Sequence, residues 1–93
     1  MASLYITEFV EMYGNCPVQP AIAEQVVEIT GNSLQSRPFH RNTKYVLLSP
    51  DANCSVRFGD DPEALVTSER LWAYSWIPFS VSPGHKVAVI SNA

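Results

Sequence analysis

The chain has 93 residues, a mass of 10.3 kDa and a net charge of −3, which is the size of one small domain. Hydrophobic residues make up 46% of the sequence and charged residues only 16%, whereas disordered chains are poor in apolar residues and rich in charge. This composition excludes a disordered chain and a solvated helical bundle. We therefore expect one β domain over residues 1–93, without separate cofactor and substrate domains.

The positive charges are too few and too scattered for nucleic-acid binding, which relies on clustered cations. The densest group is Arg37, Arg41 and Lys44, with His40 among them. Such a spread is typical of a solvated loop or strand face, so we predict no nucleic-acid partner.

Two cysteines, Cys16 and Cys54, form no CxxC motif and pair with no histidine at zinc-ligand spacing. We expect reduced thiols and no metal. Residues 1–15 lack a basic region, and two glutamates interrupt their apolar character, so we expect no signal peptide. No apolar run approaches the ~20 residues that cross a bilayer, and we expect a protein made in the cytoplasm with no membrane partner.

Seven prolines and four glycines punctuate the chain, a spacing typical of short strands joined by loops. Residues 3–13 are rich in β-branched and aromatic types and predict a strand. Residues 1–20 as a whole are interpreted either as an extended N-terminal arm or as an edge strand. Residues 21–30 alternate, with Val27 and Ile29 on the apolar face.

Three further segments are predicted in the middle of the chain. Residues 34–39 are expected at an edge or in a loop, because Pro38 cannot donate a hydrogen bond to a sheet. Residues 44–49 are apolar on both faces and predict a buried strand. Residues 54–58 alternate between apolar and polar types, the pattern of a half-buried strand.

Residues 60–76 allow two structures. Asp61, Pro62 and Glu63 are the residue types that begin helices, which allows one short helical turn near residues 61–70. The apolar residues that follow do not keep a helical stripe, which favours a loop or single turn followed by a strand.

Residues 70–81 alternate strictly and predict one strand, with Ser75 as the exception on one apolar face. The opposite face carries Trp72, Tyr74 and Trp76. Residues 86–90 predict a short closing strand. About six to eight short strands indicate an all-β fold, a small β-sandwich or jelly roll.

Catalytic motifs of the common hydrolase, nucleotide-binding and metalloprotease types do not occur. His40 and His85 each lie beside a cation in a loop or at a strand end, a context typical of ordinary surface residues. The Asp60-Asp61 pair before a proline is typical of a turn. We predict no catalytic residue, no metal, no cofactor and no enzymatic activity.

The aromatic side of residues 70–81 has two interpretations. Either other segments of the chain cover it, or it is an interface, where Trp, Tyr and Arg concentrate. A core this thin favours the interface, and the apolar N-terminal segment poses the same question. The candidate subunit or partner interface comprises Arg70, Trp72, Tyr74, Trp76, Leu4, Tyr5 and Phe9.

Most of the chain resembles small virion proteins of tailed bacteriophages. The resemblance rests on TKYVLLSPDANCSVRFGDDPEA at residues 43–64 and FSVSPGHKVAVI at residues 79–90, together with SLYITEF at residues 3–9 and AEQVVEI at residues 23–29. These are patterns of strands and turns rather than a catalytic signature. The chain departs from the family pattern at residues 71–76, where it has two tryptophans.

The resemblance implies a structural protein of the virus particle. The expected role is a capsid decoration, or cement, protein that binds the outside of the head shell and stabilises it. Its expected partners are the major capsid protein or another virion protein, together with further copies of itself in a dimer or trimer. A head–tail or tail accessory role is the alternative within the particle, and a small phage-encoded inhibitor or adaptor that binds a host protein is the alternative outside it.

Overall fold

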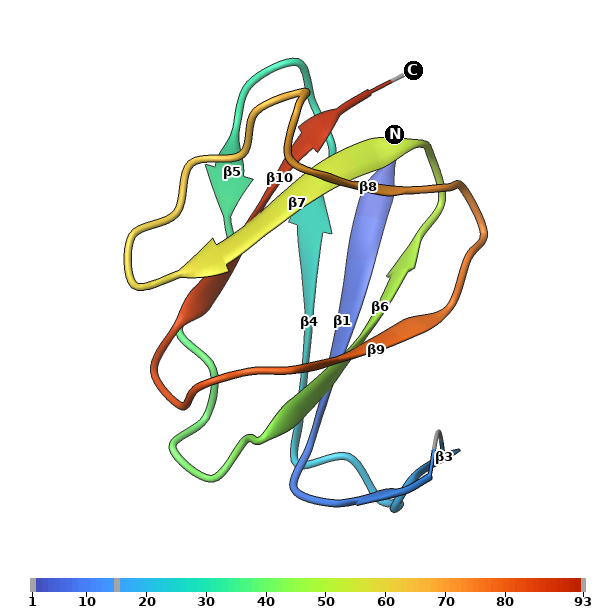
Figure 1. Cartoon of the computed structure of the whole chain (residues 1–93), viewed down its shortest axis with the longest axis vertical. Coiled ribbons are helices and arrows are strands. Elements are labelled where there is room, and N and C mark those ends of the chain that lie inside the picture. The colour runs from blue at the N-terminus through green and yellow to red at the C-terminus, as the bar shows by residue number, and fades with distance from the viewer. Residues whose placement is uncertain (1, 15, 93) are drawn as a thin grey trace.

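The computed structural model describes residues 2–14 and 16–92, which form strands and loops (Figure 1). None of these residues is helical, so no helix that could cross a membrane is found among them. The strands are β1 (Ser3–Phe9), β2 (Met12–Tyr13), β3 (Cys16–Pro17), β4 (Ala23–Glu28), β5 (Leu34–Gln35), β6 (Tyr45–Pro50), β7 (Cys54–Gly59), β8 (Glu69–Leu71), β9 (Ile77–Ser80) and β10 (Lys86–Ser91).

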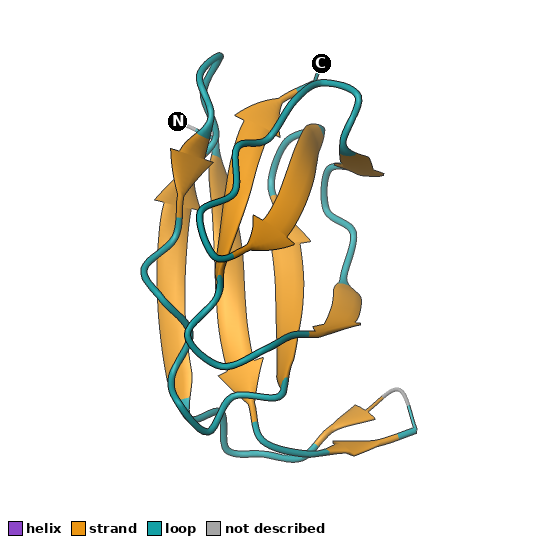
Figure 2. Ribbon diagram, turned by 60° about the vertical axis from the view of Figure 1, so that its left-hand side comes forward, coloured by secondary structure: helices purple, strands orange, loops and turns teal. Residues whose placement is uncertain are grey.

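Two four-stranded antiparallel sheets face each other, which confirms the predicted β-sandwich. The first sheet has the order β4-β1-β6-β9 and the second has the order β5-β10-β7-β8. A separate two-stranded hairpin, β2-β3, projects from one end of the sandwich (Figure 2). The outer strands β4 and β5 belong to one side of the sandwich, and β8 and β9 belong to the other (Figure 1).

Strand β1 is an interior strand of its sheet, so the part of residues 1–20 that it covers is neither an arm nor an edge strand, whereas β2 and β3 lie in the projecting hairpin. Strand β1 pairs with β4 on one side and with β6 on the other. Leu4 and Ile6 alternate with polar residues and point into the core, where each is at most 1% exposed. This apolar alternation explains why one face of β1 is covered by the core, while its two flanking strands pair with its backbone.

The core lies between the sheets and takes side chains from both. Leu4, Ile6 and Leu48 come from the first sheet, and Val56 and Val89 come from the second. Phe58 packs against Phe39 and Phe79 at ring-centroid distances of 6.4 and 5.1 Å, and so closes one end of the core. Burying these rings adds aromatic contacts to the hydrophobic transfer energy.

The helical turn near residues 61–70 is absent, and the alternative of a loop followed by a strand is confirmed. Pro62 and Ala64 are buried while their neighbours are exposed, so this segment has a period of two rather than a helical period. Asp61 accepts a hydrogen bond from Gln35 instead of capping a helix, and the Ala64 N–H donates to Ser33.

The single strand predicted over residues 70–81 is also wrong. The chain leaves the second sheet after Leu71 and enters the first sheet at Ile77, so β8 and β9 lie in different sheets. Leu71 is buried beside Cys54 and Ile77 pairs with Leu48. The sequence alternation continues through residues 72–76, but these residues form the connection between β8 and β9 and belong to neither strand.

A buried carboxylate joins the N-terminal strand to a distant loop. Glu8 is 2% exposed on the core face of β1. One carboxylate oxygen accepts the backbone N–H of His40 at 2.8 Å and the hydroxyl of Thr43 at 2.7 Å, and the other accepts the Gln25 amide at 3.2 Å. Hydrogen bonds to an ionised oxygen are stronger than neutral ones and offset the cost of burial.

We predict that Glu8→Ala lowers the free energy of unfolding by about 3 kcal/mol, because three donors lose their acceptor. Urea denaturation followed by tryptophan fluorescence measures the change. Glu24→Ala, on the exposed side of β4, is the matched control and should change stability by less than about 1 kcal/mol. Equal effects of the two substitutions would contradict the role assigned to Glu8.

The two cysteines are free and differ in environment. Cys16 is exposed and Cys54 is buried, and burial raises the pKa of the Cys54 thiol from 9.0 to about 11. Between these values the unfolded chain releases a proton that the folded chain retains. Stability therefore falls as the pH rises through this interval.

We predict that one thiol per folded chain reacts rapidly with an aromatic disulfide reagent, and that the second reacts only after denaturation.

Thermal unfolding should show that the protein is less stable at pH 10.5 than at pH 8. This loss should be smaller in Cys54→Ala than in the wild type, because the variant has no thiol to titrate at this position. Rapid reaction of both thiols in the folded protein would disprove the burial of Cys54.

Candidate functional site

The connection between β8 and β9 displays three aromatic side chains. We define the aromatic turn as residues 72–76, which run from the edge of one sheet to the edge of the other. Trp72, Tyr74 and Trp76 are 61%, 83% and 56% exposed. Together they present the equivalent of two complete aromatic side chains, about 400 Å² of surface. Exposed apolar surface of this extent on a monomer is often functional, which makes the aromatic turn a candidate interaction site.

Hydrogen bonds hold the aromatic turn against the end of β6 and the connection from β6 to β7. The Ala73 N–H donates to the side-chain oxygen of Asn53 at 2.8 Å, and the Tyr74 N–H donates to the carbonyl of Pro50 at 2.8 Å. Within the turn, the Ser75 hydroxyl donates to the Trp72 carbonyl at 2.6 Å. The aromatic side chains are therefore carried by a backbone that is bonded to the rest of the domain at two points and closed by one hydrogen bond within the turn.

The backbone at Tyr74 lies in the left-handed region, with φ of 62°. A residue with a side chain occupies this region at a cost of about 1–2 kcal/mol. Tyr74 is almost fully exposed, so contacts of its ring with the rest of the chain do not offset this cost. The strained backbone conformation therefore lies at a position whose side chain is exposed.

Arg70 completes the surface at the end of β8. Its guanidinium carbon lies 4.3 Å from the centre of the Trp72 ring, a cation–π contact. One of its nitrogens donates to the Asn92 carbonyl at 3.3 Å. Both contacts restrain the Arg70 side chain and hold its positive charge beside the Trp72 ring.

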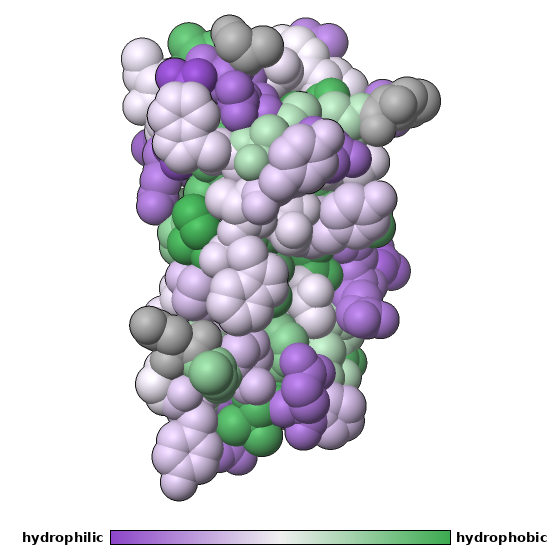
Figure 3. Space-filling model, turned by 90° about the vertical axis from the view of Figure 1, so that its right-hand side faces the viewer, coloured by the Kyte–Doolittle hydropathy of each residue, from purple (hydrophilic) through white to green (hydrophobic). Residues whose placement is uncertain are grey.

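Figure 3 looks onto this side of the molecule. Large ring-shaped side chains of intermediate hydropathy gather across the face, with apolar surface between them (Figure 3). The most hydrophilic surface lies near the top, along the sides and in one group toward the lower end (Figure 3). Aromatic residues are enriched in protein interfaces, so this face is a candidate interface.

The structure separates the seven predicted interface residues into three sets. Arg70, Trp72, Tyr74 and Trp76 come together at the aromatic turn. Tyr5 is half exposed on the outer face of β1, opposite Ser49. Leu4 and Phe9 are at most 1% exposed, so their assignment to an interface is wrong: both are buried within their own domain.

The residues that hold the turn cannot be recognised from the local sequence pattern. Asn53 and Pro50 are distant in sequence, and nothing in their local pattern points to residues 72–76. Ser75 was the available signal, because a serine interrupts the apolar face of an otherwise regular alternation. Its hydroxyl is bonded inside the turn, which explains the interruption.

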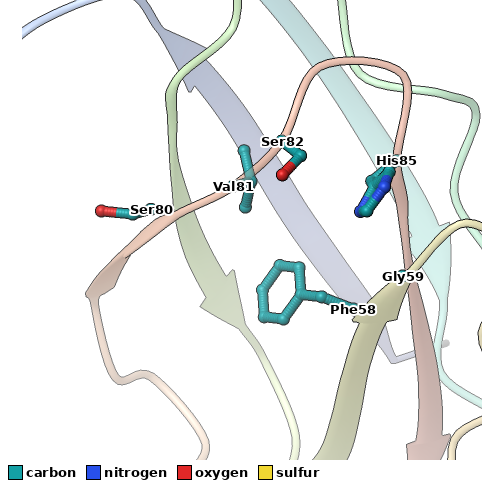
Figure 4. Close-up of a pocket in the computed structure, with 6 residues that line it drawn as sticks. All are labelled: Phe58, Gly59, Ser80, Val81, Ser82 and His85. Atoms are coloured by element: carbon teal, nitrogen blue, oxygen red, sulfur yellow. The ribbon is translucent and has the colours of Figure 1, made fainter.

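A shallow pocket lies at the end of the sandwich, near Phe58 and Gly59 (Figure 4). The side chains of Ser82 and His85 point toward the space above the Phe58 ring, whereas the Ser80 hydroxyl points away (Figure 4). No carboxylate is among the residues that line this pocket, and a serine–histidine pair requires a third group to orient the imidazole. The residues that line this pocket therefore include no acidic partner for the His85 imidazole.

The other candidate polar residues have structural partners. The imidazole of His40 accepts the backbone N–H of Asn42 at 3.0 Å, and Asp61 accepts the Gln35 amide at 2.8 Å. Among residues 2–14 and 16–92, no group of three or more histidine, cysteine or acidic side chains could hold a metal ion. Comparisons with protein-family models, curated proteins and solved structures find no match to this chain.

We predict that Tyr74→Gly increases the free energy of unfolding by about 0.5–1 kcal/mol, because glycine adopts positive φ without steric strain and its greater freedom in the unfolded chain offsets only part of this gain. Denaturant titration measures the change. Tyr13→Gly is the matched control, since Tyr13 is equally exposed but lies in strand β2, and this substitution should destabilise or leave stability unchanged. Destabilisation by Tyr74→Gly would show that the Tyr74 side chain stabilises the fold.

Proposed function

We propose that this chain is a non-enzymatic structural protein of a tailed-bacteriophage particle, a decoration protein that binds the outer head shell and stabilises it. The observation that carries the proposal is the aromatic turn, which exposes Trp72, Tyr74 and Trp76 on a backbone that is held in place. The resemblance of the strand and turn pattern to small virion proteins supplies the partner, the major capsid protein or a neighbouring virion protein.

The physical requirements of such a protein agree with this surface. A decoration protein performs no chemistry and needs only a firm contact with an assembled lattice. Exposed aromatic residues on a rigid turn lose little conformational entropy on binding and supply the central anchors of an interface. A protein that binds only the assembled shell stabilises it by mass action.

Oligomerisation is part of the same proposal. Copies that associate as a dimer or trimer at local symmetry axes gain avidity from several simultaneous contacts with the lattice. In this proposal the aromatic turn contacts the shell. Tyr5, half exposed on the outer face of β1, is a further candidate contact residue.

We predict that particles assembled without this chain lose integrity at a lower temperature, or under a smaller osmotic shock, than complete particles. Adding the purified protein should restore their resistance. The double variant Trp72→Ser/Trp76→Ser should bind shells at least about 30-fold more weakly, because the loss of even one central aromatic anchor costs about 2 kcal/mol. Sedimentation of protein with shells measures the binding.

Tyr13→Ser is the control, since it removes an even more exposed aromatic residue from the β2–β3 hairpin, and it should bind as the wild type does. Absence of the chain from purified particles would contradict the decoration role and favour an inhibitor or adaptor of a host protein. Equal robustness of complete and depleted particles would also contradict it.

A further inference from the structure

The outer strands of the two sheets differ in how they are protected against pairing with another strand. An edge strand exposes unpaired backbone N–H and C=O groups, which can bind an added strand. Strands β5 and β8 are only two and three residues long. Strand β9 has four residues and includes Pro78. Strand β4 is the longest of the four edges, with six residues and no proline.

The hydrogen-bond register shows which groups of β4 point outward. The Ile29 N–H donates to the Ala2 carbonyl at 3.0 Å, and alternate residues of an antiparallel strand bond to the same neighbour. The backbone groups of residues 25 and 27 therefore face β1, and those of Glu24, Val26 and Glu28 face away from it. Among the described residues, β4 forms a ladder only with β1.

The same reasoning shows that β9 is blocked. The Val81 N–H donates to the Lys44 carbonyl at 2.9 Å, so the backbone of residue 78 points to the free edge. That residue is proline, which has no N–H to offer. Strand β4 thus presents a continuous row of outward donors and acceptors that its counterpart across the sheet lacks.

A groove runs along this edge between β4 and β5. It is lined by residues 25–28 and 34–37. The Gln25 side chain closes the groove at one point, where its amide exchanges two hydrogen bonds with the backbone of Arg37, at 2.9 and 3.3 Å. Beyond this point Val26 and Leu34 are 58% and 39% exposed, so an added strand would find apolar contact as well as backbone partners.

The charges on β4 indicate what kind of strand fits. Glu24 and Glu28 are exposed on either side of Val26. A second copy paired with Val26 opposite Val26 would place each Glu24 opposite a Glu28, and like charges directly opposite are destabilising. A strand with lysine or arginine at both positions would instead form two favourable cross-strand pairs.

We propose that the free edge of β4 binds an extended basic segment of another protein, which adds a fifth strand to the first sheet. The recognised pattern is cation, any residue, apolar, any residue, cation, so that the cations face Glu24 and Glu28 and the apolar residue covers Val26. This site does not depend on the proposed function, because the aromatic turn lies on the opposite side of the sandwich.

The probe is the peptide acetyl-Thr-Lys-Thr-Val-Thr-Lys-Thr-amide, with a matched peptide in which both lysines are replaced by glutamate. Amide NMR shifts of the complete chain, recorded during titration at low salt, measure both the affinity and the site. We expect the lysine peptide to bind at least about fivefold more tightly than the glutamate peptide. The shifts should centre on the amides of Glu24, Val26 and Glu28, and added salt should weaken them.

Two variants test the two parts of the proposal. E24K/E28K should reverse the preference in favour of the glutamate peptide. V26P removes an outward N–H and should abolish binding of the lysine peptide, while unchanged amide shifts in β10 report that the fold is intact. Equal binding of the two peptides, shifts centred on the aromatic turn, or no binding of either peptide would overturn the proposal. Should V26P fail to fold, the charge reversal still decides it.

Discussion

The buried carboxylate of Glu8 is the constraint on which the arrangement of the sandwich depends. It lies on an interior strand and binds the backbone of His40, the hydroxyl of Thr43 and the amide of Gln25. These contacts fix the segment that carries the chain from the second sheet back to β6. Through Gln25 the same network reaches Arg37 and so joins the two sheets along the side where β4 and β5 lie. A fully satisfied polar network of this kind specifies one arrangement of its neighbours.

The other side of the sandwich is closed by the chain itself. The aromatic turn runs directly from β8 to β9 and is bonded to Asn53 and Pro50. A sandwich of this size has a core only two sheets thick, with little interior volume for a ligand. Both surfaces with potential for binding therefore lie along its sides: the aromatic turn on one, and the free edge of β4 on the other.

These two surfaces differ in the physics of binding. The aromatic turn presents apolar rings with one cation, and contact with it gains energy mainly by removing those rings from water. The edge of β4 presents backbone hydrogen-bonding groups between two carboxylates, so its binding depends on register, charge and salt. A decoration protein with both surfaces could contact the shell with one and a neighbouring basic segment with the other, and each contact can be removed without the other.

Local pattern determined the fold class and most of the strands. Apolar alternation over residues 21–30 and 54–58, and the apolar run at residues 44–49, correspond to β4, β7 and β6, because a two-residue period reports directly which side chains face a core. Local pattern also identified Trp72, Tyr74 and Trp76 as candidate interface residues. It could not show that the chain changes sheets between β8 and β9, because alternation continues across the connection. The burial of Leu4 and Phe9, the partners of Glu8 and the free edge of β4 depend on which distant strands become neighbours. Only the tertiary structure decides that, since strand pairing is set by contacts between residues far apart in the sequence.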